Sequence, residues 1–342
     1  MTQSKGQDGR PLGLARARLV DVARLAGVST KTASRVFSGE TNVSEKTRQA
    51  VIEAAARLRF RPNILARNLR SGGATRTLGL VIGDLGNPFY FKLAAGIERE
   101  LAKQGMNLIV GTTEDSPEIE TEVVNAMLSQ QVRALLIVPA AEDQSYLESE
   151  KSFGTPLIFV DRQPTNLIAD SLTLTNFEGA KEATRVLIKL GHKKISFVAN
   201  RAHLGTIQDR LRGYREAILE SGLPLSADME ILTDIEEESL EKAFEKLLNT
   251  DQGPTAVIGG NNRSSIAYIK VSRQLEKEIA YIGFDDFELA DALGISVVSF
   301  DTFEMGQKAA KLAVNRINNP SAKPRQQKTP TVFISRGSEQ VR

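Results

Sequence analysis

The sequence predicts an α/β protein whose core contains two lobes, each built on a parallel sheet, behind a small all-α head. Apolar runs rich in β-forming residues alternate with helical patterns from residue 78 onward, which is typical of parallel sheets covered on both faces. Short helical patterns separated by glycine precede them. The segment from residue 78 to residue 342 is too long for one such sheet, so we expect two lobes.

Composition excludes several classes of protein. Hydrophobic residues make up 41% and charged residues 25%, which suits a globular protein with a sizeable core. The absence of cysteine excludes disulfides and thiol catalysis, and two histidines are too few for a His-rich metal site. No apolar run reaches the roughly 18 residues of a membrane span, and the N-terminus lacks a signal-peptide pattern. We therefore expect a cytoplasmic protein with no membrane partner.

Charge is divided unevenly along the chain. Residues 1–76 contain 15 Lys and Arg against 5 Asp and Glu, whereas residues 77–342 contain 29 against 37. A concentrated basic segment attracts polyanions through counterion release, and nucleic acid is the usual partner. The alternative is a solvated basic tail. The helical pattern of the head distinguishes a nucleic-acid-binding segment from such a tail.

The head begins with a helix–turn–helix pattern. Apolar residues at helical spacing predict a helix over Leu19–Ala26, and Gly27 ends it. Ser29 is a suitable N-cap for a second helix over Thr30–Phe37. Two helices joined by a tight glycine turn are the motif that inserts its second helix into the major groove of DNA.

Two further helices are expected before the core. Ser44 caps a third helix over Glu45–Arg59, which carries an apolar stripe at i, i+3, i+4 and i+7. Asn63 caps a short fourth helix over Ile64–Arg70, before Ser71-Gly72-Gly73 ends the pattern.

The second helix is the expected reader of DNA bases. Thr30 and Lys31 at its start and Arg35 one turn later share an exposed face. Lysine and arginine donate hydrogen bonds to guanine O6 and N7 in the major groove. The alternative is that Lys31 and Arg35 contact only phosphates, although a bidentate guanidinium suits guanine.

Nine apolar runs of the core are expected as strands. Helical patterns lie between most of them, for example over Phe89–Gln104 and Phe177–Leu190. The runs are Leu78–Ile82, Asn107–Thr112, Ala134–Val138, Leu157–Asp161, Ile195–Ala199, Ala256–Gly260, Ala280–Asp285, Val297–Phe300 and Thr331–Ser335.

Polar and aromatic residues cluster where these strands end, which is where open α/β sheets bind ligands. Aromatic faces stack on sugar C–H groups, and Asp, Asn and Arg bond hydroxyls from both sides. Each residue also has a structural alternative: Asp285 as a helix cap, Arg210 as a partner of Asp209, Phe89 as core. The effector candidates are Asp84, Asn87, Phe89, Tyr90, Asp161, Arg162, Arg210, Asn261 and Asp285.

Nothing in the sequence indicates catalysis. Neither a GxGxxG nor a GxxxxGK[ST] phosphate loop is present, and no nucleophile–base pair or metal cluster stands out. His192 lies in a turn before a strand and is expected to make a structural hydrogen bond, whereas His203 lies in a loop and is a weaker candidate for the ligand site. We expect no enzyme activity, no cofactor and no metal.

The stretch LVDVARLAGVSTKTASRVFSGETNVSEKTRQAVIEAAARLRFRPNILARNLRSG resembles the DNA-binding head of the lactose-repressor (LacI) family. The resemblance implies a DNA-reading second helix and a hinge helix over Asn63 to Leu69, whose leucine wedges open a minor-groove base step. Relatives usually place Thr or Ser where this chain has Arg18. The assigned DNA contacts are Thr30, Lys31, Thr32, Ser34, Arg35, Asn63, Arg67 and Leu69.

The core resembles the effector domain of the same family and the periplasmic sugar-binding proteins, most closely the ribose-binding type. The landmarks are GHKKI, RLRGYREA, PTAVIGGNN, YIGFDDFELA and MGQKAAKL. The resemblance implies two Rossmann-like lobes that hold a sugar or ribonucleoside between them. Departures include Asn262, where relatives usually have Asp, and Phe300, where a polar residue is common.

Together these patterns predict a transcriptional regulator, expected to be a repressor, that binds operator DNA as a homodimer and is switched by a small effector. The alternative is a sugar-binding protein or sugar-acting enzyme without a regulatory role. The predicted segments are a disordered basic tail over 1–17, the helix–turn–helix domain over 18–62, the hinge over 63–75 and the core over 76–342. Within the core, lobe one comprises 76–172 and 302–330, and lobe two comprises 173–301 and 331–342.

Overall fold

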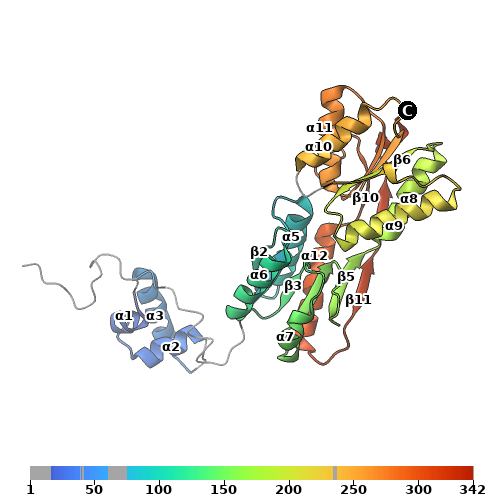
Figure 1. The fold of residues 1–342 in the computed structure, drawn as a ribbon. Helices are drawn as coiled ribbons and strands as arrows, with labels where there is room; N and C mark the ends of the chain where they lie inside the picture. Colours follow the sequence, from blue (N-terminus) through green and yellow to red (C-terminus); the bar gives the residue numbers. More distant parts are fainter. Residues whose placement is uncertain (1–16, 39, 41, 61–74, 234–236, 342) are drawn as a thin grey trace, which may run out of the picture. The chain divides into compact units, whose positions relative to one another are not determined.

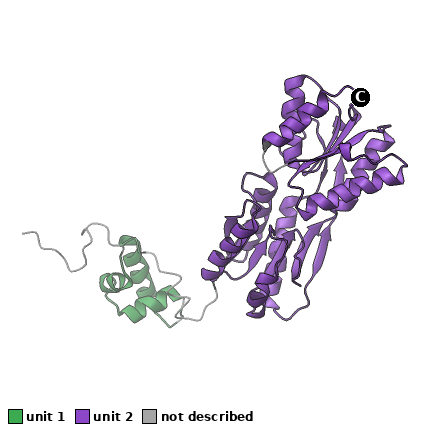
Figure 2. Cartoon of the chain, in the orientation of Figure 1, with its two compact units in different colours: residues 1–75 green, residues 76–342 purple. Residues whose placement is uncertain are grey.

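Residues 17–38, 40, 42–60, 75–233 and 237–341 are described by a computed structural model (Figure 1). The chain divides into two units, residues 1–75 and residues 76–342 (Figure 2). The expected hinge helix and nearly all of the expected basic tail lie outside the described residues. Among the described helices, none is long and apolar enough to cross a membrane.

Three helices form the described part of the first unit: α1 (Leu19–Leu25), α2 (Thr30–Ser38) and α3 (Glu45–Arg57). Gly27 separates α1 from α2 at φ +67°, a backbone conformation that favours glycine. The hydroxyls of Ser29 and Ser44 accept hydrogen bonds from the first turns of α2 and α3 at 3.0 Å and 3.2 Å. The helices enclose a small core of Val22, Ala23, Ala33, Val36, Val51, Ala54 and Ala55.

Two helices of the head begin or end differently from the sequence prediction. Helix α3 ends at Arg57, two residues earlier than predicted, and Arg59 beyond it adopts φ 49°, which is left-handed. Helix α1 starts without a hydroxyl cap. The backbone N–H of Arg18 instead donates to the Asp21 carboxylate at 2.9 Å. A side chain within the first turn of the helix therefore satisfies the N–H that precedes it.

Lobe one of the core is a six-stranded parallel sheet in the order β11-β5-β4-β3-β1-β2. Its strands are β1 (Thr77–Ile82), β2 (Asn107–Thr112), β3 (Leu135–Ile137), β4 (Leu157–Asp161), β5 (Asp170–Leu174) and β11 (Gln326–Thr329). Helices α5 (Pro88–Ala102) and α12 (Thr302–Asn318) cover one face of the sheet. Helix α6 (Pro117–Ser129) covers the other, and the short helix α7 (Glu148–Ser152) lies between β3 and β4 in the chain.

Lobe two is a second six-stranded sheet in the order β12-β10-β9-β8-β6-β7. Its strands are β6 (Ile195–Asn200), β7 (Glu230–Thr233), β8 (Ala256–Gly259), β9 (Ala280–Phe284), β10 (Ser296–Ser299) and β12 (Val332–Ile334). Helices α8 (Asn176–Lys189) and α9 (Gly205–Glu220) pack on one face of the sheet. Helices α10 (Glu237–Leu248) and α11 (Asn262–Leu275) pack on the other.

The chain passes between the lobes three times, from β5 to α8, from β10 to α12 and from β11 to β12. Two of these crossings contact each other, because the Thr175 hydroxyl accepts a hydrogen bond from the Thr331 backbone N–H at 2.8 Å. As a result, loops that follow the carboxyl ends of strands in both sheets face a common space between the lobes, which is the geometry that positions the site.

All nine predicted strands are present, and the prediction of two α/β lobes with a helical head is confirmed. Strand β12 departs from the parallel prediction because it runs antiparallel to β10 at the sheet edge. Three further strands were not predicted. Strands β11 and β7 lie at sheet edges and are partly exposed, and β5 begins with Asp170-Ser171, so none of them forms the continuous apolar run of a buried strand.

Candidate functional site

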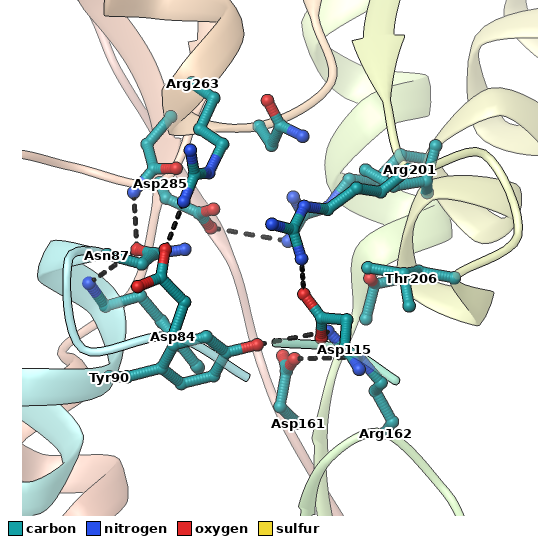
Figure 3. A pocket seen from close by; sticks show the side chains of 16 residues that line it. Asp84, Asn87, Tyr90, Asp115, Asp161, Arg162, Arg201, Thr206, Arg263 and Asp285 are labelled. Carbon is teal, nitrogen blue, oxygen red and sulfur yellow. Dashed lines mark hydrogen bonds and ion pairs between the residues drawn. The ribbon is translucent and has the colours of Figure 1, made fainter. Parts of the chain in front are cut away.

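A cavity between the two lobes is lined by loops from both sheets (Figure 3). Four aspartates and four arginines line it with three asparagines and two aromatic rings. The lining residues are Asp84, Asn87, Phe89, Tyr90, Asp115, Asp161, Arg162, Arg201, Leu204, Thr206, Ile207, Arg210, Asn261, Asn262, Arg263 and Asp285.

All nine effector candidates from the sequence line this cavity, although their contact with a ligand remains a prediction. Seven lining residues were not among the candidates. Asp115 and Arg201 follow strands β2 and β6, so the strand-end rule that selected the others would also have found them. The remaining five are Leu204, Thr206, Ile207, Asn262 and Arg263.

Arg210 is almost fully buried in the site, with 4% of its surface exposed. Its guanidinium donates to Asn176 Oδ1 at 2.8 Å, to the Gly260 carbonyl at 2.8 Å and to Asp285 Oδ1 at 3.3 Å. It also lies 4.3 Å from the centre of the Phe284 ring, within cation–π range. Helix α9 therefore holds a fixed set of donors at the cavity wall, and Asp285, which follows strand β9, is their charge partner.

The structural alternatives for Arg210 and Asp285 are wrong. Asp209 pairs with Arg212 at 2.6 Å and not with Arg210. Asp285 accepts from Arg210 and is not among the residues that cap the described helices. By contrast, Asn87 and Asn261 do cap α5 and α11, through backbone N–H groups at 3.0 Å and 2.9 Å.

Arg162 forms the matching fork on lobe one. Its terminal nitrogens donate to the Pro139 carbonyl at 2.8 Å, to the Tyr90 hydroxyl at 3.0 Å and to Asp115 Oδ1 at 3.0 Å. Phe89 packs edge-on against Tyr90 at 5.0 Å between ring centres, and against Phe300 at 5.8 Å. The rings of Phe89, Tyr90 and Phe300, which we call the aromatic wall, therefore lie beside the Arg162 guanidinium.

Polar contacts cross the cavity from one lobe to the other. Asp115 pairs with Arg201, and Asp84 pairs with Arg263. Asn262 Nδ2 donates to Asn87 Oδ1 at 2.7 Å. The lobes are therefore closed on each other, and a ligand has to exchange some of these contacts for its own.

Four cavity residues have left-handed backbone conformations that are uncommon outside glycine. The φ angles are 56° at Asp115, 68° at Asp161, 58° at Arg201 and 67° at Asp285. Such conformations persist where the surrounding structure determines them, and they concentrate at ligand sites. All four lie at or just beyond strand ends, so the strain turns polar side chains into the cavity.

Burial raises the pKa of Asp161 to about 6, partly offset by the positive charges of Arg162 and Arg210, while Asp285 raises it further. Burial also raises the pKa of Tyr90, against the nearby Arg162 charge. The aspartate therefore titrates within an accessible pH range, and the tyrosine stays a neutral hydroxyl.

This titration predicts how stability depends on pH. Because the folded pKa of Asp161 lies above its unfolded value, its contribution to stability is fully present below pH about 4 and is lost as the pH rises through about 6. Asp161→Asn should therefore gain up to about 3 kcal/mol of unfolding free energy relative to wild type between pH 4 and pH 8. Urea unfolding across this range measures it. The exposed Asp228→Asn is the control, and a pH-independent difference for Asp161→Asn would contradict the assignment.

The two histidines have different surroundings. His192 Nδ1 lies 2.9 Å from Thr255 Oγ1, as expected for a structural hydrogen bond. His203 lies in an exposed loop beside a neighbouring cavity, and burial followed by the charges of Arg162 and Arg201 lowers its pKa. Among the described residues, no three acidic or histidine side chains are grouped to hold a metal ion.

In the head, Thr30, Lys31 and Arg35 are exposed on one side of α2, as predicted. Arg35 pairs with Glu40 at 3.3 Å, while Thr32 and Ser34 are half-buried. The other three assigned DNA contacts, Asn63, Arg67 and Leu69, lie outside the described residues.

Comparison with protein families identifies both parts of the chain. Residues 18–63 match the model of bacterial regulatory proteins of the lacI family. Residues 75–337 match the model of periplasmic binding proteins and the sugar-binding domain of the LacI family.

Individual proteins agree with the family match. Catabolite control protein A of Priestia megaterium is 32% identical over 313 residues, covering 88% of this chain and 92% of that protein. The ribose operon repressor of Escherichia coli K12 is 30% identical over 329 residues, covering 94% and 99%. The lac repressor dimer bound to operator and the anti-inducer ONPF has the same fold, with a TM-score of 0.81 at 23% identity, covering 95% and 99%.

The family model of the core covers well over half of the chain, and the head model accounts for the basic N-terminal helices. The alternative of a sugar-binding protein or enzyme without a regulatory role is therefore wrong. The chain belongs to the LacI family of bacterial regulatory proteins and is a DNA-binding transcriptional regulator, not an enzyme.

Proposed function

We propose that the protein is a repressor whose affinity for operator DNA is switched by a neutral, sugar-like effector in the interlobe cavity. The observation that carries this proposal is the pair of buried guanidinium forks, Arg162 and Arg210, beside Asp161, Asp285 and the aromatic wall. Fork-shaped donors with neighbouring carboxylate acceptors suit vicinal hydroxyls, and aromatic faces suit sugar C–H groups. The contacts proposed are the nine effector candidates.

Charge balance supports a neutral ligand. The four aspartates lining the cavity face four arginines, with ion pairs for Asp84, Asp115, Asp161 and Asp285. An anionic ligand would leave one carboxylate without its partner in a dry site, which is unfavourable. Ribose or a ribonucleoside is the favoured class, and the similarity to a ribose operon repressor is consistent with it.

We propose the same division of the chain into segments that the sequence predicts. We assign residues 1–17 to a disordered basic tail, 18–62 to DNA reading, 63–75 to the hinge and 76–342 to the effector core. Lobe one takes 76–172 with 302–330, and lobe two takes 173–301 with 331–342. Since its target is chromosomal DNA, we assign the protein to the cytoplasm.

Two copies of the chain would present two heads to a near-palindromic operator. A short hinge helix is marginal away from DNA, so a change in lobe geometry can melt or order it. Asn63, Arg67 and Leu69 would then contact the minor groove only in the ordered state. Ligand and operator influence each other by one coupling free energy, typically about 1–3 kcal/mol.

Substitutions in α2 test the head assignment. Lys31→Ala or Arg35→Ala should weaken binding to the specific operator by about 1–3 kcal/mol if the side chain bonds a base, because the partner acceptor on the base is left unpaired. Fluorescence anisotropy with operator and random duplexes measures both affinities. Equal losses on the two duplexes would show that the contact is made only to phosphate.

A thermal-shift screen tests the effector assignment. The full chain is heated with ribose, other pentoses, ribonucleosides, purines and hexose phosphates. A ligand at about 100 times its Kd stabilises the fold by about 2.7 kcal/mol. Stabilisation by ribose or a ribonucleoside supports the proposal. Stabilisation only by hexose phosphates would contradict a neutral effector.

A further inference from the structure

The amino ends of the parallel strands of lobe one form the edge of the sheet that lies away from lobe two (Figure 1). Short segments lead into the strands at this edge, and none of them contains Asp or Glu: residues 75–76, 103–106, 130–134, 153–156, 166–169 and 319–325. They do contain five basic residues, which we call the basic edge: Arg76, Lys103, Arg133, Lys323 and Arg325.

The corresponding edge of lobe two has a different charge. The segments that lead into its parallel strands contain three lysines against four acidic residues: 191–194, 221–229, 249–255, 276–279 and 292–295. Residues 77–342 as a whole are also acidic, with 29 Lys and Arg against 37 Asp and Glu. Surfaces of soluble proteins usually intersperse both signs. The basic edge is therefore a local concentration of positive charge on an otherwise acidic unit.

Most of this charge is not neutralised within the described part of the protein. Lys103 pairs with Glu100 at 2.7 Å. The other four side chains make no ion pair or hydrogen bond with any described residue: Arg76, Arg133, Lys323 and Arg325. Arg133 is half-buried, and its Nε atom is buried without a hydrogen-bond partner among the described residues. Because buried donors are nearly always satisfied, this guanidinium indicates that an acceptor from beyond the described residues belongs beside it.

The backbone places the unpaired charges in a row along the sheet. Arg325 directly precedes β11, and its carbonyl accepts from the Ser171 N–H at 2.9 Å. Arg133 lies two residues before β3, and its N–H donates to the carbonyl of Thr77, the neighbour of Arg76, at 2.7 Å. Neighbouring strands lie about 4.8 Å apart, so the row from β11 to β1 spans roughly 19 Å. A row of that length can meet several phosphates of one DNA strand, which recur about every 3.4 Å along the duplex axis.

Duplex DNA is the polyanion that this surface fits best. The chain belongs to a family of DNA-binding regulators, and residues 61–75 join its head to the core at this same edge, before Arg76. A segment of that length spans at most roughly 54 Å, so a duplex held by the head stays tethered near the basic edge. Tethering raises the effective concentration of the duplex, which lets individually weak phosphate contacts contribute to affinity. An acidic protein surface is the other class of partner, and it has no such tether.

We propose that the basic edge is a second DNA-binding surface, which contacts phosphates of the duplex that the head binds. Lysine and arginine release counterions when they neutralise phosphates, so these contacts add affinity on any sequence and increase its dependence on salt. The surface adds to the contacts assigned to the head, and the reading of bases stays with α2.

Binding of the full chain to a random duplex of about 40 base pairs tests the proposal, by fluorescence anisotropy between about 50 and 200 mM NaCl. The double variant Lys323→Ala with Arg325→Ala removes two charges at β11, four strands away from β1, where the chain enters the core. The matched control, Lys193→Ala with Lys246→Ala, removes two exposed charges from lobe two, so both double variants have the same net charge. Urea unfolding of each variant checks that the core is folded.

The control should keep the wild-type slope of log affinity against log salt concentration. The double variant at β11 should reduce the magnitude of this slope by about 1–2, at about 0.9 for each lost phosphate contact, and weaken binding about threefold to tenfold at the lowest salt. Arg133→Ala should reduce it by about 1, and the double variant decides if this half-buried change unfolds the core. Equal slopes for the two double variants would overturn the proposal and point to an acidic protein as the partner. A loss of affinity without a change of slope would also overturn it.

Discussion

Replacing Arg210 by alanine should abolish the response to effector while operator binding without ligand is retained. The substitution removes donors to Asn176, Gly260 and Asp285 and leaves the Asp285 carboxylate without its partner. Truncating one member of a buried charge pair weakens binding by about 2–5 kcal/mol, so effector affinity should fall at least about 30-fold. Isothermal titration with the screened ligand measures the loss.

The neighbouring Arg212→Ala is the matched control, because Arg212 lies on the same helix, is exposed, and contacts Asp209 and the ring of Phe177 rather than the residues that Arg210 holds. Arg210→Lys should also fail, since an ammonium cannot reproduce the three-way fork. Urea unfolding of each variant shows whether the core is folded, and operator binding shows that the DNA-reading head, which belongs to the other unit, is intact. A normal effector response in Arg210→Ala would mean that the cavity is not the effector site.

The second large effect is expected at Glu120, a fully buried carboxylate on α6. It accepts hydrogen bonds from the backbone N–H groups of Ala140 and Ala141 and from the Tyr146 hydroxyl at 2.7 Å. These bonds fix the loop whose Pro139 carbonyl accepts from Arg162. Glu120→Ala leaves three donors unmatched, and hydrogen bonds to a charged group contribute about 1.5–3 kcal/mol each. The unfolding free energy should therefore fall by about 3 kcal/mol or more.

Chemical denaturation measures this loss, and ligand titration measures its effect on the site. Tyr146→Phe is the control because it removes one of the three bonds and should lower the unfolding free energy by about 1.5 kcal/mol, half or less of the loss expected for Glu120→Ala. Glu120→Ala should also weaken effector binding, since Arg162 loses a fixed carbonyl partner. Equal stabilities for Glu120→Ala and Tyr146→Phe would show that the loop does not depend on the carboxylate.

Sequence patterns predicted most of the fold because buried strands and capped helices leave strong local signals. The nine apolar runs and the serine caps of α2 and α3 are examples. Edge strands leave weaker signals. Strand β11, with the sequence QQKT, is largely exposed and is held in the sheet by its backbone pairing with β5. Its side chains therefore carry no pattern that marks a strand.

Some features of the candidate site could likewise be predicted from the sequence, and others could not. Residues at the ends of apolar strands, such as Asp161 and Asp285, could be found from the sequence because the strand itself was recognisable. The partners of each residue could not be found in this way. Arg201 meets Asp115 and Arg263 meets Asp84 across the cavity only because the three crossings bring the lobes together. The neighbouring cavity beside His203 likewise depends on packing between loops that are distant in the chain.

The central claim is that the interlobe cavity and operator DNA are thermodynamically linked. The most direct test is the operator affinity of the full chain with and without a saturating ligand from the screen, in wild type and in Arg210→Ala. We predict that the ligand changes the wild-type affinity by about 5- to 150-fold and leaves that of Arg210→Ala unchanged. An operator affinity that stays the same with every ligand that binds the core would contradict the linkage.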